Sequence, residues 1–174
     1  GSDTCGSIRI PAANQNLVGL RATQGLSSRT GVIPLSTTQD VAGPLARSVT
    51  DLAIMLDATV GPDPADPVTR DAAAYIPKTY REALSADGLK DARIGVLRSL
   101  FGTAPEDNEV ATLVRKSLDA MKAQGAEVID VVVPGMEDLV RDSSVIDDEF
   151  KFDLADYLAR HPGVSRKTPP CALQ

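Results

Sequence analysis

The sequence predicts an α/β fold, and three observations indicate it. Its 174 residues, of which 43% are hydrophobic and 24% charged, have the composition of a globular domain. Residues 94–133 follow the order strand, helix, strand, a unit that builds parallel sheet through a right-handed crossover. A further helix with its own cap begins after Ser48. Because no internal repeat is visible, we expect one α/β domain.

Residues 1–60 are the first of four segments. Up to residue 47 the segment is rich in Gly, Ser, Thr and Pro, and its apolar runs 17–20 and 32–35 are typical of short strands between turns. Ser48 is expected to cap a helix together with Asp51, three residues later. The predicted apolar face of this helix consists of Val49, Leu52, Ala53 and Leu56, and Gly61 is expected to end it.

Two irregular segments flank the predicted strand–helix–strand unit. Residues 61–90 are a loop region rich in Pro and Asp, because its prolines lack a backbone donor and restrict the residues before them. Residues 161–174 read as an irregular tail without an apolar pattern that would continue the fold. Since both ends look cut or diverged, we interpret residues 1–174 as a single incomplete domain.

Residues 91–160 contain the regular elements of the second half. Apolar and β-branched runs predict strands at 94–97 and 128–133. The helix between them is expected to start at a capping pair, Thr103 with Glu106, and to end at Gly125. Its apolar positions are Val110, Leu113, Val114, Leu118 and Met121. The last helix presents Phe150, Leu154, Tyr157 and Leu158 on one face.

Composition and charge argue against several classes of function. The formal net charge of −6 would repel phosphate backbones, so nucleic acid is not expected as a direct partner. Cys5 and Cys171 lie at opposite ends without metal-ligand spacing, which predicts free thiols and neither zinc nor another cofactor. The apolar stretches fall short of the ~18 residues that a membrane span needs. These features favour a cytoplasmic location with no membrane contact.

The segment 1–12, GSDTCGSIRIPA, contains the candidate catalytic residue, Ser7. The small residues before Ser7 allow a tight turn whose backbone amides can point toward a developing oxyanion, as acyl-transfer chemistry requires. Taken alone, the pattern also fits an ordinary Gly-Ser turn.

The residues that follow are similar, block by block and in order, to the amidase signature family. The blocks are VGLR at 18–21, Ser28-Arg29 with Gly31 and Pro34-Leu35, and Asp40 with GPLARSV at 43–49 and Asp51. The run EFK at 149–151, with Asp153-Leu154 and Tyr157-Leu158, resembles the peptide amidase-like subgroup. The chain therefore resembles an internal piece of such a hydrolase, with a mixed, mostly parallel sheet covered by helices.

The resemblance implies a role for each residue of the candidate site. Ser7 would be the nucleophile, and the amides of Thr4, Cys5, Gly6 and Ser7 would form the oxyanion hole. Asp3 and Arg9 would pair and brace the loop. The substrate would be a small-molecule or peptide amide with a linear carbon–nitrogen bond, and the reaction would pass through an acyl-enzyme.

The family activates its serine with a neutral lysine that acts through a second serine in a cis peptide, both N-terminal to the nucleophile. Neither is found before Ser7 in this sequence, where Ser2 belongs to the nucleophile loop itself. We therefore expect the chain to be inactive alone and to need an N-terminal segment of the same protein. Two alternatives stay open: a non-catalytic remnant or binding module, and one component of an amidotransferase.

Other polar residues have simpler interpretations. His161 is expected to cap a helix rather than to bind a metal, and the acidic run 147–149 reads as a solvated helix face. Three positions differ from the family pattern: Cys5 and Asn16 replace glycine, and Ala22 replaces proline. Cys5 would strain the loop only if its backbone needed a positive φ.

Overall fold

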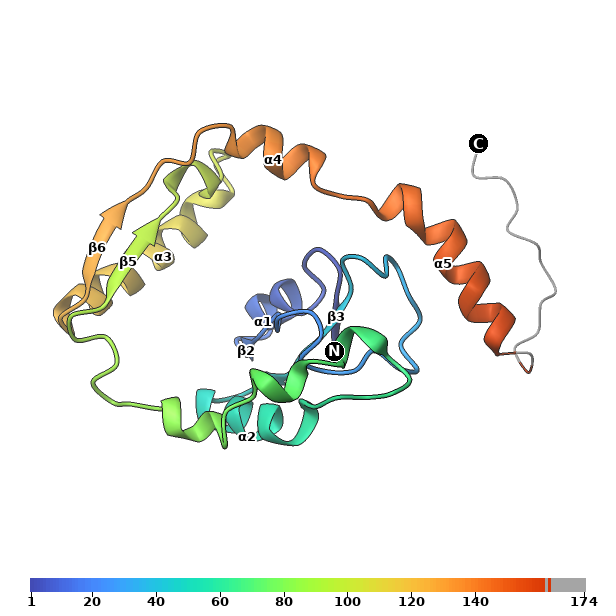
Figure 1. The fold of residues 1–174 in the computed structure, drawn as a ribbon. Helices are drawn as coiled ribbons and strands as arrows, with labels where there is room; N and C mark the ends of the chain where they lie inside the picture. Colours follow the sequence, from blue (N-terminus) through green and yellow to red (C-terminus); the bar gives the residue numbers. More distant parts are fainter. Residues whose placement is uncertain (162, 164–174) are drawn as a thin grey trace. The chain divides into compact units, whose positions relative to one another are not determined.

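The structure is a computed structural model that describes residues 1–161 and 163. The predicted tail at 161–174 therefore lies almost wholly outside the described residues. The chain divides into two compact units, one formed by residues 1–82 with the chain from Ser143 onward, and one formed by Ala83–Asp142. We call them the discontinuous unit and the inserted unit. Both mix helices with strands, so the fold is α/β as the sequence predicts (Figure 1).

Two short antiparallel strand pairs organise the discontinuous unit. Strand β1 (Ser2–Asp3) pairs with β3 (Val41–Ala42), and β2 (Val18–Gly19) pairs with β4 (Leu45–Ala46). Helix α1 (Arg9–Asn14) connects β1 to β2. The β1–β3 pair matters for the site, because it places the start of the chain beside the segment that follows Asp40.

Helix α2 (Val49–Thr59) confirms the predicted cap. The Ser48 hydroxyl accepts a hydrogen bond from the Asp51 amide at 3.1 Å. Leu52, Ala53 and Leu56 are buried, and Leu52 and Leu56 form a core cluster with Ala46 of β4. Val49 was expected on this face but is 54% exposed. The buried stripe is therefore narrower than predicted.

The strand expected at 32–35 is absent, and local hydrogen bonds explain why. The amides of Leu35 and Ser36 donate to Oδ2 of Asp40 at 2.9 and 3.1 Å. A side-chain acceptor thus replaces the partner strand for these donors, and Pro34 has no donor to offer. The chain turns directly after this segment, at residues 36–40, where the Asp40 amide donates to the Ser36 carbonyl oxygen at 2.7 Å.

The Pro/Asp-rich region after α2 is irregular, as predicted. It contains only short 3-10 turns, which are Pro67–Thr69, Ala72–Ala74 and Tyr80–Ala83. Arg29 ties the region to the preceding loop through an ion pair with Asp66, whose facing atoms are 2.9 Å apart. The Asp63 carboxylate accepts from the hydroxyls of Ser28 and Thr30 as well.

The inserted unit confirms the predicted strand–helix–strand order. Strand β5 (Arg93–Val96) pairs in parallel with β6 (Glu127–Asp130), and Ile94 faces Val128 in the register. Helix α3 (Asp107–Ala123) connects the two strands and packs against β6 (Figure 1). Gly125 follows α3 with a φ of +94°, the conformation that glycine adopts after a helix.

Two details of α3 differ from the prediction. The capping pair of Thr103 and Glu106 is wrong: Glu106 makes no cap, and the Asp107 carboxylate accepts from the Ala104 amide at 3.1 Å instead. The apolar stripe is only partly used. Leu118 is buried with Ala111, while Val110 and Leu113 are exposed, because two strands are too narrow to cover the whole stripe.

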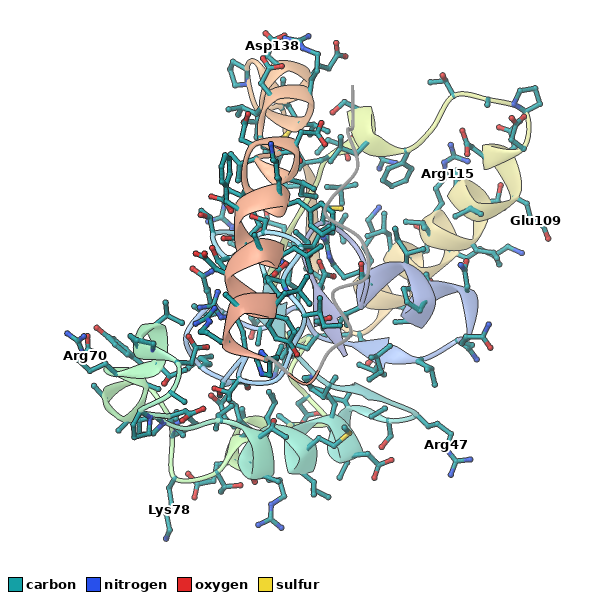
Figure 2. The ribbon with its side chains drawn as sticks, turned by 90° about the vertical axis from the view of Figure 1, so that its right-hand side faces the viewer. Arg47, Arg70, Lys78, Glu109, Arg115 and Asp138 are labelled. Atoms are coloured by element: carbon teal, nitrogen blue, oxygen red, sulfur yellow. The ribbon has the colours of Figure 1, made fainter. Side chains whose placement is uncertain are left out.

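Charged side chains extend outward from the polar face of α3. Figure 2 labels Glu109 and Arg115, whose charged side chains point away from the ribbon. Helix α4 (Met136–Asp142) closes the inserted unit.

Helix α5 (Ile146–Arg160) belongs to the discontinuous unit. Its half-buried side contains all four predicted apolar residues, Phe150, Leu154, Tyr157 and Leu158. Nδ1 of His161 lies 2.8 Å from the Tyr157 carbonyl oxygen, which agrees with the expected capping role. Among the described residues, no helix is long and apolar enough to cross a membrane.

Candidate active site

The predicted nucleophile lies in a sharp loop between β1 and α1. The chain leaves β1 at Asp3, turns through residues 4–7 and enters α1 after Ile8. Ile8 is fully buried, whereas Ser7 is exposed. The Ile10 amide donates to the Gly6 carbonyl oxygen at 2.8 Å, so the helical turn begins before the formal start of α1. The loop thus presents Ser7 at the surface beside a buried anchor.

The buried carboxylate of Asp3 holds this loop together from inside. Oδ2 of Asp3 accepts from the Ile8 amide at 3.0 Å, across the turn that contains Ser7. Arg9 contributes its Nε at 3.3 Å, and Arg21 contributes Nη1, 3.0 Å from Oδ1. Arg21 also donates to the backbone carbonyl oxygen of Asp3. Asp3 and Arg9 are therefore adjacent, and Arg21 is a second cation on the same carboxylate.

These contacts fix the charge state of Asp3. Burial alone raises the pKa of the carboxyl, but hydrogen bonds from the Ile8 amide and the Arg9 side chain, with the charge of Arg9, outweigh it. The net pKa lies below the ordinary value of 3.8. Asp3 is therefore ionised at neutral pH, and its charge is compensated where it lies.

The Ser7 hydroxyl and the amides of residues 5–7 have no hydrogen-bond partner in the part of the chain that the structure describes. No hydrogen bond joins the Ser7 hydroxyl to another group there, and the amides of Cys5, Gly6 and Ser7 meet no acceptor. Gly6 is buried. Since a buried backbone donor is nearly always paired, the unpaired amide of Gly6 suits an acceptor supplied from outside, and the amides of the exposed Cys5 and Ser7 lie next to it in the chain.

The family departures at Cys5 and Asn16 have different structural consequences. Cys5 is exposed, and its φ is not positive, so its Cβ meets no steric penalty. Asn16 has a φ of 52° just after α1. Asparagine tolerates this left-handed region better than most side chains, which accounts for its presence where glycine is frequent.

A second support reaches the loop from the turn at 36–40. The Thr4 hydroxyl donates to Oδ1 of Asp40 at 2.5 Å, while Oδ2 of the same carboxylate holds the amides of Leu35 and Ser36. Arg21 adds a link, because its Nη2 donates to the Gln39 carbonyl oxygen at 2.7 Å. From the sequence, Thr4 is expected to contribute only its backbone amide to the site, and Arg21 and Asp40 stand out only as members of family motifs.

Helix α5 contacts the same turn through acidic side chains. Glu149 accepts from the Ser36 hydroxyl at 2.5 Å and from the Thr38 amide at 3.2 Å. Asp153 accepts from the Thr37 amide at 2.7 Å. The expectation of a solvated face for 147–149 is therefore wrong at Glu149. The sequence does contain a signal for this contact: Glu149 and Asp153 are four residues apart, which places both acids on the same side of the helix as its apolar residues.

Comparison with known proteins places this geometry in a family. The family model described as Amidase matches residues 1–168. A probable amidase of Arabidopsis thaliana is 36% identical over 159 residues, which cover 91% of this chain and 30% of that protein. A glutamyl-tRNA(Gln) amidotransferase component of Zymomonas mobilis is 37% identical and matches 97% of this chain with 33% of its own length.

The solved structures give the same result. The peptide amidase from Stenotrophomonas maltophilia is 37% identical and superposes with a TM-score of 0.77, covering 93% of this chain and 33% of that one. The chain thus spans about a third of the length of the relatives that it matches. By a family match over almost its whole length and by its fold, the chain belongs to the amidase family, the amidase signature hydrolases.

Proposed function

We propose that the protein hydrolyses linear amides with Ser7 as the nucleophile, through an acyl-enzyme intermediate. The observation that carries the proposal is the exposed Ser7 in a loop whose amides at Cys5, Gly6 and Ser7 meet no acceptor among the described residues. In this proposal those amides, with that of Thr4, form the oxyanion hole. Asp3 and Arg9 brace the loop through their ion pair.

The chemistry follows from these positions. The Ser7 oxygen attacks the amide carbon, and the carbonyl oxygen becomes an anion that the loop amides stabilise. The carbon–nitrogen bond then breaks, the amine leaves with a proton, and water hydrolyses the acyl-serine. Because the amides are fixed before substrate arrives, they lower the barrier without reorganisation. Donors of this kind are worth roughly 10²–10³ in kcat each.

A serine hydroxyl at neutral pH also needs a base. Among the described residues, no lysine or histidine forms a hydrogen bond with Ser7. We propose that the base is a lysine acting through a second serine, as the family resemblance implies, and that both lie in a segment of the protein beyond these 174 residues. Residues 1–174 are then part of one amidase domain whose other parts complete the site. The relatives, about three times longer, support this view.

Labelling by a fluorophosphonate probe tests the proposal in the intact protein. Wild type should label and hydrolyse amides, and Ser7→Ala should do neither while its Tm stays within about 2 °C, because an exposed hydroxyl contributes little to stability. Ser2→Ala is the matched control, since Ser2 is an exposed serine of the same segment, and it should label like wild type. Continued turnover by Ser7→Ala would place the nucleophile elsewhere.

A second candidate function is transfer of an amide nitrogen within a larger assembly. It is favoured by relatives whose names describe them as components of glutamyl-tRNA(Gln) amidotransferase. Under this alternative the same Ser7 chemistry releases ammonia for an acceptor molecule that a partner protein binds. Purification of the intact protein with its bound partners distinguishes the two, because a hydrolase would act alone. The cytoplasmic location expected from the sequence stays a proposal, which cell fractionation tests.

A further inference from the structure

The 36–40 turn stands between helix α5 and the 3–8 loop and contacts both. On one side it is bound by the acids of α5, Glu149 and Asp153. On the other side it binds Thr4, a residue of the candidate oxyanion hole, directly, and it supports Asp3 through Arg21. The 36–40 turn therefore connects helix α5 to the 3–8 loop.

The contacts on the helix side are extensive for so short a turn. Glu149 holds the hydroxyls of Ser36 and Thr38 together with the Thr38 amide, and Asp153 holds both the amide and the hydroxyl of Thr37. The hydroxyls and amide lower the pKa of Glu149, which keeps it ionised and an acceptor at neutral pH. Three successive residues of the turn are thus fixed by two carboxylates.

The contacts on the loop side are buried and go to defined atoms. Ser36 and Asp40 are almost fully buried, and the Asp40 carboxylate spans from the Ser36 amide to the Thr4 hydroxyl. Arg21 joins the Gln39 carbonyl oxygen to the Asp3 carboxylate, which in turn holds the Ile8 amide. A shift of the turn would therefore displace the acceptors that shape the loop on both sides of Ser7.

We propose that Glu149 and Asp153 are positioning residues for the 3–8 loop: by fixing the 36–40 turn, they hold Asp3 and Thr4, and through them the amides beside Ser7, in their working geometry. Neither acid touches substrate in this proposal. For catalysis the inference rests on the function proposed above, but its structural part, the coupling of α5 to the loop, does not.

Hydrogen exchange in the intact protein measures that coupling directly. The reporters are the amides of Ile8 and Ile10, which bond to Asp3 and to Gly6, and the reference is the amide of Val60 at the end of α2. In Glu149→Ala the two reporters should exchange about tenfold faster, as expected when charged hydrogen bonds that restrain local opening are lost. Val60 should change by less than about twofold.

Asp148→Ala is the matched control. It removes an acid from the same first turn of α5, so its effect on the helix dipole is similar, but the exposed Asp148 side chain makes no hydrogen bond or ion pair with the described residues. In Asp148→Ala the amides of Ile8 and Ile10 should exchange as in wild type. If Glu149→Ala loosens the whole unit, the ratio of Ile8 to Val60 exchange decides: a raised ratio supports the coupling, and an unchanged ratio overturns it.

Fluorophosphonate labelling of Ser7 in the same variants tests the catalytic part of the proposal. Glu149→Ala should label about tenfold more slowly than Asp148→Ala if the loop amides are displaced. Fast exchange with undiminished labelling would refute positioning for catalysis. If wild type itself does not label, the proposed function fails, while the exchange result still decides whether α5 holds the loop.

Discussion

Nη1 of Arg21 lies 3.0 Å from Oδ1 of Asp3 and also donates to the backbone carbonyl oxygen of the same residue. One guanidinium thus fixes both the side chain and the main chain of Asp3, while its other nitrogen holds the Gln39 carbonyl oxygen. The carboxylate that it serves is fully buried. Arg21 therefore links the 3–8 loop to the 36–40 turn, in addition to the bond between Thr4 and Asp40.

The first prediction concerns this link. Arg21→Met should lower the free energy of unfolding by about 2–3 kcal/mol, because charged hydrogen bonds are lost and a buried carboxylate keeps only Arg9 as a cation. Urea unfolding measures the loss. Arg47→Met is the control, since the exposed Arg47 side chain projects from the molecule (Figure 2) and should cost less than about 0.5 kcal/mol. Equal losses in both would contradict the assigned role of Arg21.

Cys5 provides a second prediction. Because its backbone φ is not positive and its side chain is exposed, Cys5→Gly should change the labelling rate of Ser7 by less than about tenfold, or about 1.4 kcal/mol in barrier. Stopped-flow labelling of the intact protein measures the ratio. A much larger gain would show that cysteine distorts the oxyanion hole, and it would favour the non-catalytic remnant.

A third prediction tests close packing beside the loop. A Cβ on Gly43 would lie 2.2 Å from the Leu20 carbonyl oxygen, a backbone atom, and 3.0 Å from Cδ1 of Ile8. Gly43→Ala should therefore destabilise the protein by about 1–3 kcal/mol through overpacking. Thermal unfolding compares it with Gly163→Ala, whose Cβ would meet no atom of the described residues within 4 Å. If Gly43→Ala left the stability unchanged, the segments around Gly43 and Leu20 would have to move apart easily.

The Arg29–Asp66 ion pair predicts a pH dependence. Hydrogen bonds from the Arg29 side chain lower the pKa of Asp66 below 3.8, against the opposing effect of burial. A carboxyl whose pKa is lowered by folding stabilises the protein above its unfolded pKa, and this stability is lost as pH falls through the folded pKa. Between about pH 5 and pH 2, wild type should thus lose more stability than Arg29→Met. Parallel curves for both proteins, from urea titrations at each pH, would disprove the coupling.

Residues 1–174 alone should not label rapidly at Ser7. Within the described chain no base contacts the hydroxyl, and an unactivated serine reacts slowly. Adding the remaining part of the protein, in trans or by fusion, should restore labelling, with Ser7→Ala as the control. Fast labelling of the 174 residues alone, in a sample that light scattering shows to be monodisperse, would require a base within them.

The sequence predicts interactions between residues that lie close together in the chain better than those between distant residues. The cap of α2 involves Ser48 and Asp51, which are three residues apart. The pairing of Asp3 with Arg9, six residues apart, was expected from the family resemblance. The strand at 32–35 was wrong because Asp40 supplies an acceptor that apolar periodicity does not register. The partners of Arg21 and Glu149 lie 18 to 113 residues away, and no pattern within one segment reveals them.

The bond between Ser36 and Glu149 joins positions 113 residues apart, and the whole inserted unit lies between them in sequence. At a synthesis rate of about 5–20 residues per second, the turn emerges from the ribosome roughly 6 to 23 s before its helix. During that interval water takes the place of Glu149 and Asp153 as the acceptor for its hydroxyls, and the inserted unit, being contiguous, is free to fold first. The time before this closure grows in proportion to the number of residues added to the inserted unit. The entropic cost of closing so long a loop grows only with the logarithm of its length, so the added residues would weaken the closed state only slightly.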